Sequence, residues 1–149
     1  MSFAIVPYSD SLKDSLFGFY AECFPGIGKA FEPEGRHDFY NHIPEHFESF
    51  WCLVDDGIVK GSVAIRRFNE DTAELKALYL SEELRGQGCG RKLFDTAISY
   101  AREQGYARVV LDSMKSYVSA RRLYDSCGFK EIECYNDNTF AEVFMELVF

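Results

Sequence analysis

The alternation of apolar and polar residues predicts short strands and helices in the first part of the chain. Residues 4–8 form a predicted strand, placed at a sheet edge because Pro7 has no N–H to donate to a neighbouring strand. A helix that ends before Pro25 follows, and its apolar residues are Leu12, Leu16, Phe17, Phe19 and Tyr20. Several glycines and prolines interrupt segment 26–49. There we expect a loop with one short helix near residues 34–42.

The middle of the chain has the pattern of antiparallel strands joined by tight turns. Two apolar segments, 50–54 and 58–68, flank an Asp-Asp-Gly turn at 55–57, which is a strong hairpin signal. A second turn at 69–71 leads into a strand at 73–80. Segment 73–80 is therefore predicted to be the third strand of this region.

The next elements predict a crossover between parallel strands. A helix over 91–104 carries an apolar stripe, and Gly105 can end it as a C-cap. Residues 108–112 are a short, continuous apolar strand of the kind found inside a sheet. Together, residues 73–112 form strand, glycine-rich loop, helix and strand, which is a right-handed crossover unit by default.

The last elements are one helix and two strands. A helix is predicted over 119–127 with Gly128 as its cap, followed by strands at 129–135 and 140–149. The Phe-rich final strand is compatible with completing the core and with pairing to a second copy, so a homodimer stays open. No repeat or linker separates the elements, and we expect one domain over 1–149.

Composition narrows the class of partner. The chain is 47% hydrophobic and 16% aromatic, which is too rich for a disordered protein. Its formal net charge of −8 repels nucleic-acid phosphates, so nucleic acid is not an expected partner. The same charge attracts cationic ligands, so an amine substrate is compatible with it.

Cysteine usage and hydropathy suggest a cytoplasmic protein. The five cysteines are odd in number and form no CxxC pair, so we expect reduced thiols and neither a zinc knuckle nor a thioredoxin-type site. Residues 1–10 lack the pattern of a signal peptide. No apolar segment is long enough to span a bilayer, so no membrane association is expected.

The most informative segment is the loop at 85–91, between the strand at 73–80 and the following helix. It reads Arg85-Gly86-Gln87-Gly88-Cys89-Gly90-Arg91. Glycines at alternate positions leave backbone N–H groups free to point into one concave surface, and the helix N-terminus adds partial positive charge. The two arginines can add charge-assisted contacts. This pattern predicts a site for the phosphate groups of a cofactor.

Two motifs in order resemble those of the GNAT superfamily of acyl-CoA-dependent N-acyltransferases. The family signature Gln/Arg-x-x-Gly-x-Gly/Ala is met by Arg85 to Gly90. A second family pattern, Ala-x-x-Leu-Tyr-x-x-x-Gly-Phe, stands at Ala120 to Phe129. The resemblance is strong over residues 73–130. It implies an α/β (mixed α+β) fold in which a mixed sheet of about six to seven strands splays between the glycine-loop strand and the next parallel strand, flanked by about four helices.

The resemblance also implies the donor, acetyl-CoA, and the residues that bind it. The loop amides, from Arg85 to Arg91, would take the pyrophosphate. Backbone groups of the preceding strand would bind the pantetheine arm and help to polarise the thioester; these belong to Leu78, Tyr79 and Leu80. Cys89 would contribute its amide and not a nucleophile. Many members carry an Asn that contacts the cofactor where this chain has Tyr117, which departs from the family pattern at that contact.

Acyl transfer needs an acid for the leaving thiolate and an unprotonated amine. Tyr124 matches the family tyrosine that supplies the proton, and the alternative is an aromatic ring packed on the core face of its helix. Glu74 is the candidate base, directly or through water, and the alternative is a carboxylate on a solvated strand end. Strand alternation predicts that Glu74, Lys76 and Leu78 share one face.

The three histidines do not predict a metal site. His42 and His46 have i, i+4 spacing, but Pro44 lies between them and is expected to disrupt a helix there. We expect no metal, and place His37, His42 and His46 in an exposed loop or in the lining of a substrate pocket. Segment 26–49 covers the acceptor side in the family.

These observations favour an acetyltransferase that moves an acetyl group from acetyl-CoA to a primary amine by direct attack. A small-molecule acceptor is expected because the chain is compact and carries no appended recognition module. A protein or peptide amine, a noncatalytic CoA-binding or regulatory module, and a dinucleotide oxidoreductase are the alternatives. The oxidoreductase is disfavoured because the loop lacks the Gly-x-Gly-x-x-Gly spacing and a second mononucleotide half.

Overall fold

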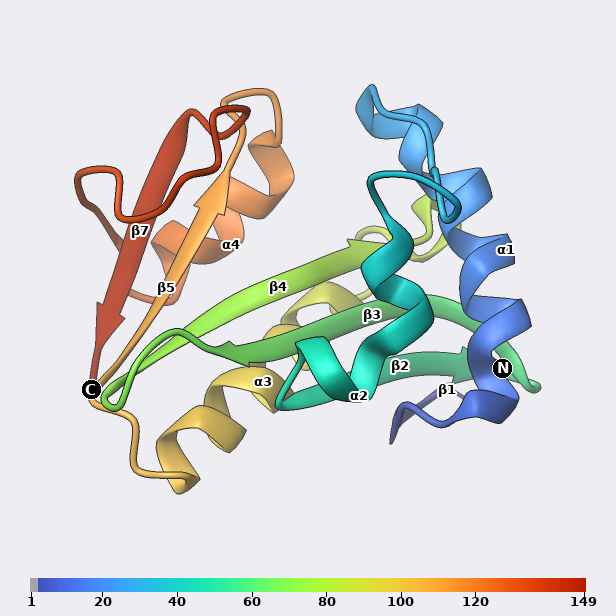
Figure 1. The fold of residues 1–149 in the computed structure, drawn as a ribbon, viewed down its shortest axis with the longest axis horizontal. Helices are drawn as coiled ribbons and strands as arrows, with labels where there is room; N and C mark the ends of the chain where they lie inside the picture. Colours follow the sequence, from blue (N-terminus) through green and yellow to red (C-terminus); the bar gives the residue numbers. More distant parts are fainter. Residues whose placement is uncertain (1–2) are drawn as a thin grey trace.

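The computed structural model describes residues 3–149, which form a mixed seven-stranded sheet with helices on both faces (Figure 1). The strand order across the sheet is β1-β2-β3-β4-β5-β7-β6. The strands are β1 (Phe3–Pro7), β2 (Ser49–Asp55), β3 (Ile58–Arg67), β4 (Thr72–Leu80), β5 (Arg108–Ser113), β6 (Lys130–Glu131) and β7 (Val143–Val148). The α-helices are α1 (Lys13–Cys23), α2 (Ile43–His46), α3 (Cys89–Glu103) and α4 (Val118–Ser126). Four 3-10 turns are η1 (Asp10–Leu12), η2 (Phe24–Ile27), η3 (Asp38–His42) and η4 (Glu82–Leu84).

Strands β1 to β4 form an antiparallel meander, and its turns follow from local chemistry. Between β2 and β3, Asp56 and Gly57 have φ values of 51° and 77°, which a two-residue hairpin turn of the right twist requires. Between β3 and β4, Asn69 Oδ1 accepts hydrogen bonds from the N–H groups of Asp71 and Thr72. The predicted hairpin and the predicted second turn are therefore confirmed.

The sheet splays where β4 meets β5. The two strands are parallel, as predicted for the crossover, but pair only over Thr72–Glu74 and Arg108–Val110. Beyond these pairs β5 turns away with β7, and the carboxyl ends of β4 and β5 diverge (Figure 1). The resemblance placed the splay between these two strands, and the structure confirms it.

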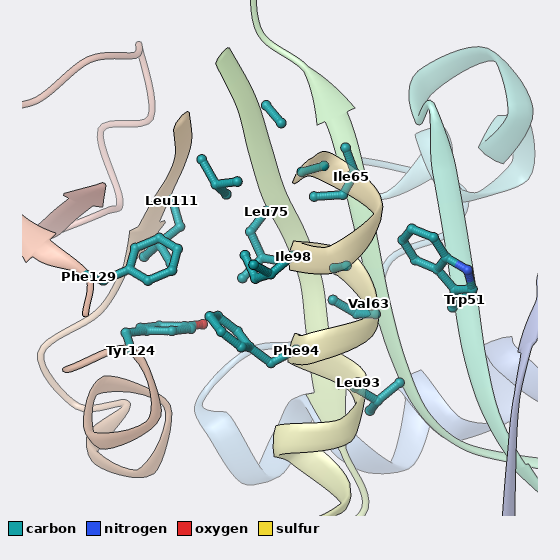
Figure 2. Close-up of a cluster of buried hydrophobic side chains, with 14 of the residues drawn as sticks. Trp51, Val63, Ile65, Leu75, Leu93, Phe94, Ile98, Leu111, Tyr124 and Phe129 are labelled. Carbon is teal, nitrogen blue, oxygen red and sulfur yellow. The ribbon is translucent and has the colours of Figure 1, made fainter. Parts of the chain in front are cut away.

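The core has two parts, one on each face of the sheet. Helices α3 and α4 cover one face, where Leu93, Phe94 and Tyr124 lie in an apolar cluster with Val63 and Leu75 (Figure 2). Helix α1 and the segment through η3 and α2 cover the other face with a cluster rich in aromatic residues, which are Phe19, Tyr20, Phe24, Tyr40, Phe47 and Phe50.

One prediction about secondary structure was wrong. The strand predicted over 129–135 is only Lys130–Glu131, because Tyr135 and Asn136 leave the ladder and hydrogen-bond to carboxylates of β4 and β5. Near Pro44 the chain is interrupted as expected: η3 ends at His42, whose backbone is not helical, and α2 begins at Ile43, so His42 and His46 do not share one continuous helix. Pro44 lies in the first turn of α2, where its missing N–H would have had no helical partner.

Within residues 3–149, no helix is long and apolar enough to cross a membrane. The expectation that residues 1–10 carry no signal peptide concerns in part Met1 and Ser2, which lie outside the described residues.

Candidate active site

A β-bulge in β4 lies beside the splay. The register between β3 and β4 shifts between Ser62 and Ala64, so that Ala77 and Leu78 of β4 stand opposite a single residue of β3. Ala77 has φ of 55°, which is uncommon for a residue with a side chain. The extra residue interrupts the ladder and leaves backbone groups of β4 unpaired at this point.

The bulge corrects the predicted faces of β4. Leu75 and Leu78 both pack against the core on the α3 side, whereas Tyr79 packs on the α1 side. Since Glu74 and Lys76 flank Leu75 in the regular part of the strand, they point to the α1 side. Leu78 therefore does not share a face with Glu74, and the prediction that it does was wrong. Because of the bulge, Tyr79 and not Leu78 lies on the same face as Glu74.

A buried chain of hydrogen bonds reaches the bulge from α1. The hydroxyls of Tyr20 and Ser62 are 2.9 Å apart, and Ser62 Oγ donates to the main-chain carbonyl of Ala77 at 2.7 Å. Both Tyr20 and Ser62 are fully buried. Sequence reasoning missed Ser62, because a serine inside a strand carries no signal until its cross-strand partner is known.

The glycine loop is exposed at the N-terminus of α3. Gly86 and Gly88 both have φ of 79°, a left-handed conformation that favours glycine. A methyl group built at either position would meet no atom within 4 Å. The loop therefore presents bare backbone to open space directly before a 15-residue helix, as an anion site requires.

The side chains of the loop residues point to different surroundings. Arg85 and Gln87 are exposed, and Arg91 Nε donates to Asp95 Oδ1 at 3.1 Å. The side chain of Cys89 is 4% exposed and packs in the α3-side core, away from the loop surface.

Tyr124 lies in the core between α3 and α4. Its ring packs against Phe94 and Phe129 at centroid distances of 6.1 Å and 5.9 Å, and Figure 2 shows its hydroxyl pointing toward Phe94. Within residues 3–149 no buried side-chain oxygen lacks a hydrogen-bond partner. The Tyr124 hydroxyl, which has no partner among these residues, therefore reaches accessible space. Burial and the negative charge of Asp112 raise its pKa, so the phenol stays protonated at neutral pH.

Glu74 is buried, so the alternative to a catalytic base, a carboxylate on a solvated strand end, was wrong. The residue is 2% exposed. Its Oε2 accepts from the Tyr135 hydroxyl at 2.6 Å and from Asn136 Nδ2 at 3.3 Å, and Lys76 Nζ lies 3.5 Å away. Burial, followed by the charge of Glu74, raises the pKa of Tyr135, which therefore remains the donor.

Asp112, at the end of β5, extends this network across the splay. Its Oδ2 accepts from Asn136 Nδ2 at 2.7 Å and lies 3.3 Å from Lys76 Nζ. Glu74 and Asp112 thus share the Lys76 ammonium, and Glu74 Oε1 also lies 3.9 Å from the exposed guanidinium of Arg66. Sequence reasoning missed Tyr135 and Asn136, since the strand predicted over 129–135 ends there and carries no sign of a partner on β4 or β5.

The remaining predicted residues lie around the open ends of β4 and β5. Tyr79 projects from β4 into the α1-side aromatic cluster, and Leu80 packs on the α3 side. Tyr117 is half-buried and precedes α4 directly. Burial raises the pKa of Tyr117.

The histidine segment is only partly exposed. His37 is buried beside Phe24 and Phe31, and its Nδ1 accepts from the N–H of Glu32 at 2.9 Å, so the expectation of an exposed loop was wrong for this residue. His42 and His46 are exposed. Within the described residues, no group of three or more potential ligands could hold a metal ion.

The comparisons with known proteins agree with this architecture. The family model described as Acetyltransferase (GNAT) family matches residues 13–129. Human N-acetyltransferase 8B is 34% identical over 113 residues, which cover 72% of this chain and 48% of the relative. N-acetylaspartate synthetase from Rattus norvegicus is 37% identical over 84 residues, 56% of this chain and 28% of the relative. The chain thus spans about half or less of the length of these two relatives.

Solved structures show the same fold. An acetyltransferase from Streptococcus agalactiae superposes with a TM-score of 0.88 at 23% identity, covering 99% of this chain and 98% of that one. A putative acetyltransferase from Salmonella typhimurium, solved with its cofactor acetyl-CoA, gives a TM-score of 0.76 at 18% identity over 99% and 94% of the two chains. From the extent of the family match, together with the splayed sheet and the glycine loop, we conclude that this chain belongs to the GNAT acetyltransferase family.

Proposed function

We propose that the chain transfers an acetyl group from acetyl-CoA to a primary amine of a small molecule by direct attack. The observation that carries the proposal is the bare glycine loop at the N-terminus of α3, placed at the end of a strand that splays from its parallel neighbour. Ligands of open α/β sheets bind at the carboxyl ends of the strands, where such a crevice opens. The activity of the whole protein is part of this proposal.

The donor would be bound by backbone groups. The amides from Arg85 to Arg91 would take the pyrophosphate at the helix N-terminus, where the open space at Gly86 and Gly88 fits a phosphate. The backbone groups of Leu78, Tyr79 and Leu80, which lie beyond the last pair between β4 and β5, would bind the pantetheine arm like an added strand and polarise the thioester carbonyl. Tyr117, half-buried directly before α4, would line the same opening.

The reacting groups would then act from both faces of β4. The amine nitrogen attacks the thioester carbonyl carbon, the carbon–sulfur bond breaks, and the thiolate takes a proton from the Tyr124 hydroxyl. Glu74 accepts the amine's proton, directly or through water. Its position on the α1 side of β4 supports this role, because segment 26–49 covers that side.

One domain over 1–149 would carry the whole site, and the five free thiols are compatible with a reducing, cytoplasmic location. A homodimer through the exposed end of β7, at Val148 and Phe149, would leave the splay open.

A panel of amines tests the function through release of CoA from acetyl-CoA. The panel should contain polyamines, amino acids, aminoglycosides and lysine peptides. We expect acetyl-CoA to raise the melting temperature and at least one small amine to release CoA. If only the lysine peptides release CoA, the acceptor is a protein or peptide amine and not a small molecule. Thermal stabilisation without CoA release on any amine would favour a noncatalytic CoA-binding module, and stabilisation by NAD alone would overturn the proposal.

A further inference from the structure

The ammonium group of Lys29 lies on the acceptor side of β4. Its Nζ donates to the Tyr79 hydroxyl at 2.8 Å and lies 4.9 Å and 5.0 Å from the ring centroids of Phe24 and Tyr79. The side chain is half-buried, although Lys29 belongs to a loop that also contains exposed residues. Contacts with two aromatic rings and a phenol fix the position of this ammonium.

No carboxylate neutralises Lys29 within the part of the chain that the structure describes. The salt bridges of residues 3–149 pair Lys60 with Glu83, and Lys76 with Glu74 and Asp112, but leave Lys29 without an acidic partner within 4.0 Å. Burial, and next the positive charge of Arg36, lower its pKa. A half-buried ammonium of this kind gains most from a bound anion.

The same face of β4 also carries two carboxylates, which belong to Glu74 and to Asp112 of the neighbouring strand. Glu74 and Asp112 both lie near the ammonium of Lys76, and the exposed guanidinium of Arg66 lies 3.9 Å from Glu74 Oε1. Tyr79 and Glu74 share the α1 side of β4 because of the bulge at Ala77. The acceptor face therefore combines the carboxylates of Glu74 and Asp112, which already lie near two cations, with the Lys29 ammonium, which has no acidic partner within the described residues.

We propose that the acceptor is an amine that also carries a carboxylate, such as an amino acid, and that Lys29 binds this carboxylate. The ammonium of the incoming acceptor is attracted to Glu74 and Asp112, and its carboxylate pairs with Lys29 over the rings of Phe24 and Tyr79. This inference rests on the proposed function and assigns the substrate class of the same site. It departs from the overall charge of −8, which by itself favours purely cationic amines.

Matched acceptors test the carboxylate requirement. For an α-amino acid, its amide and its decarboxylated amine, we expect kcat/KM to be about 10- to 100-fold higher for the amino acid, because only it pairs with Lys29. Lys29→Met removes this preference mainly by raising the acceptor KM, and leaves the KM for acetyl-CoA and the rate with the decarboxylated amine unchanged. Lys29→Arg keeps part of the preference, since the charge is retained.

Lys13→Met is the control variant. Lys13 is also half-buried, and its Nζ lies 5.5 Å from the ring centroid of Phe17 on the outer part of α1. We expect this variant to keep the full preference for the amino acid. Equal or better turnover of the amide and the decarboxylated amine by the wild type would overturn the inference, and so would a rise in the KM for acetyl-CoA in Lys29→Met.

A measurement of amino-acid binding tests the inference independently of catalysis. An amino acid added to the complex with CoA should raise the melting temperature of the wild type and not that of Lys29→Met. If no amine releases CoA, the proposed function fails, whereas this difference in binding would still support a carboxylate site at Lys29. Absence of amino-acid binding to the wild-type complex would remove the site itself.

Discussion

The Ser62 hydroxyl donates a hydrogen bond to the main-chain carbonyl of Ala77, and this 2.7 Å contact joins β3 to the bulge of β4. The carbonyl belongs to a residue with φ of 55°, so the bond stabilises a conformation that alanine rarely adopts. Tyr20 of α1 completes the chain at 2.9 Å. Ser62 on β3 thus helps to position the backbone of β4 that we propose binds the thioester.

Ser62→Ala should therefore impair catalysis without removing the donor. The carbonyl of Ala77 and the hydroxyl of Tyr20 lose their buried partner, which costs about 1–3 kcal/mol of unfolding free energy. We expect kcat to fall about tenfold with little change in the KM for acetyl-CoA, measured by steady-state kinetics and urea denaturation. Ser99→Ala, on the exposed side of α3, is the control. An unchanged kcat in a destabilised Ser62→Ala would show that the bulge is held without this hydroxyl.

Gly88→Ala and Gly105→Ala separate backbone strain from ligand binding. Both glycines have positive φ, 79° and 88°, and neither has an atom within 4 Å of an added methyl group. Each substitution should cost about 1 kcal/mol of stability from strain. Only Gly88→Ala should weaken acetyl-CoA binding, by about tenfold or more, because its methyl group enters the proposed phosphate site. Equal affinities in calorimetric titrations would argue against phosphate binding by the loop.

Tyr124→Phe removes a hydroxyl and keeps the packing. The ring contacts with Phe94 and Phe129 do not involve the oxygen, so the melting temperature should change little. If Tyr124 protonates the leaving thiolate, kcat should fall about 100-fold while acetyl-CoA still binds. Tyr106→Phe, whose hydroxyl donates to Glu48 at 2.7 Å, should lose stability but not turnover. A Tyr124→Phe enzyme with full turnover would assign the residue to packing alone.

The order of elements was predictable from sequence because short-range signals determine it. The turn at Asp56 and Gly57, the glycines of the loop and the apolar stripe of α3 each act within a few residues. The splay between β4 and β5 followed from the resemblance and not from periodicity. The family membership confirmed the identification made from the two motifs.

The parts that sequence could not predict depend on contacts between distant residues. The bulge at Ala77 reverses the faces of β4, and its cause lies on β3, in a register that one strand's sequence does not contain. Residues 129–135 have a strand pattern, but Tyr135 reaches Glu74, 61 positions away, and the tertiary hydrogen bond overrides the pattern. The position of the Lys29 ammonium was likewise not predictable, because it depends on the rings of Phe24 and Tyr79 that pack around it.

Alkaline pH should destabilise the fold through its buried tyrosines. Burial raises the pKa of each of four tyrosines, which are Tyr20, Tyr40, Tyr79 and Tyr124. An unfolded tyrosine loses its proton near pH 10, before the folded one does, so stability is complete below that pH and falls as pH rises. Each such tyrosine should contribute a slope of about 1.4 kcal/mol per pH unit in urea denaturation. Tyr40→Phe should remove one contribution; an identical slope in this variant would contradict the assignment.

Glu74→Gln distinguishes a catalytic base from a structural carboxylate. Glutamine has nearly the same shape and can still accept from the Tyr135 hydroxyl, so the buried network should survive. It cannot take a proton from the amine, and we expect kcat at neutral pH to fall about 100-fold with the KM for acetyl-CoA unchanged. The loss should shrink as pH rises, because more of the amine is then already unprotonated, whereas a packing defect would not respond in this way. Glu146→Gln, which removes a partly buried ion pair with Arg108 at 2.7 Å, is the control and should keep its turnover. A fall of less than about threefold in Glu74→Gln would mean that water alone carries the proton away.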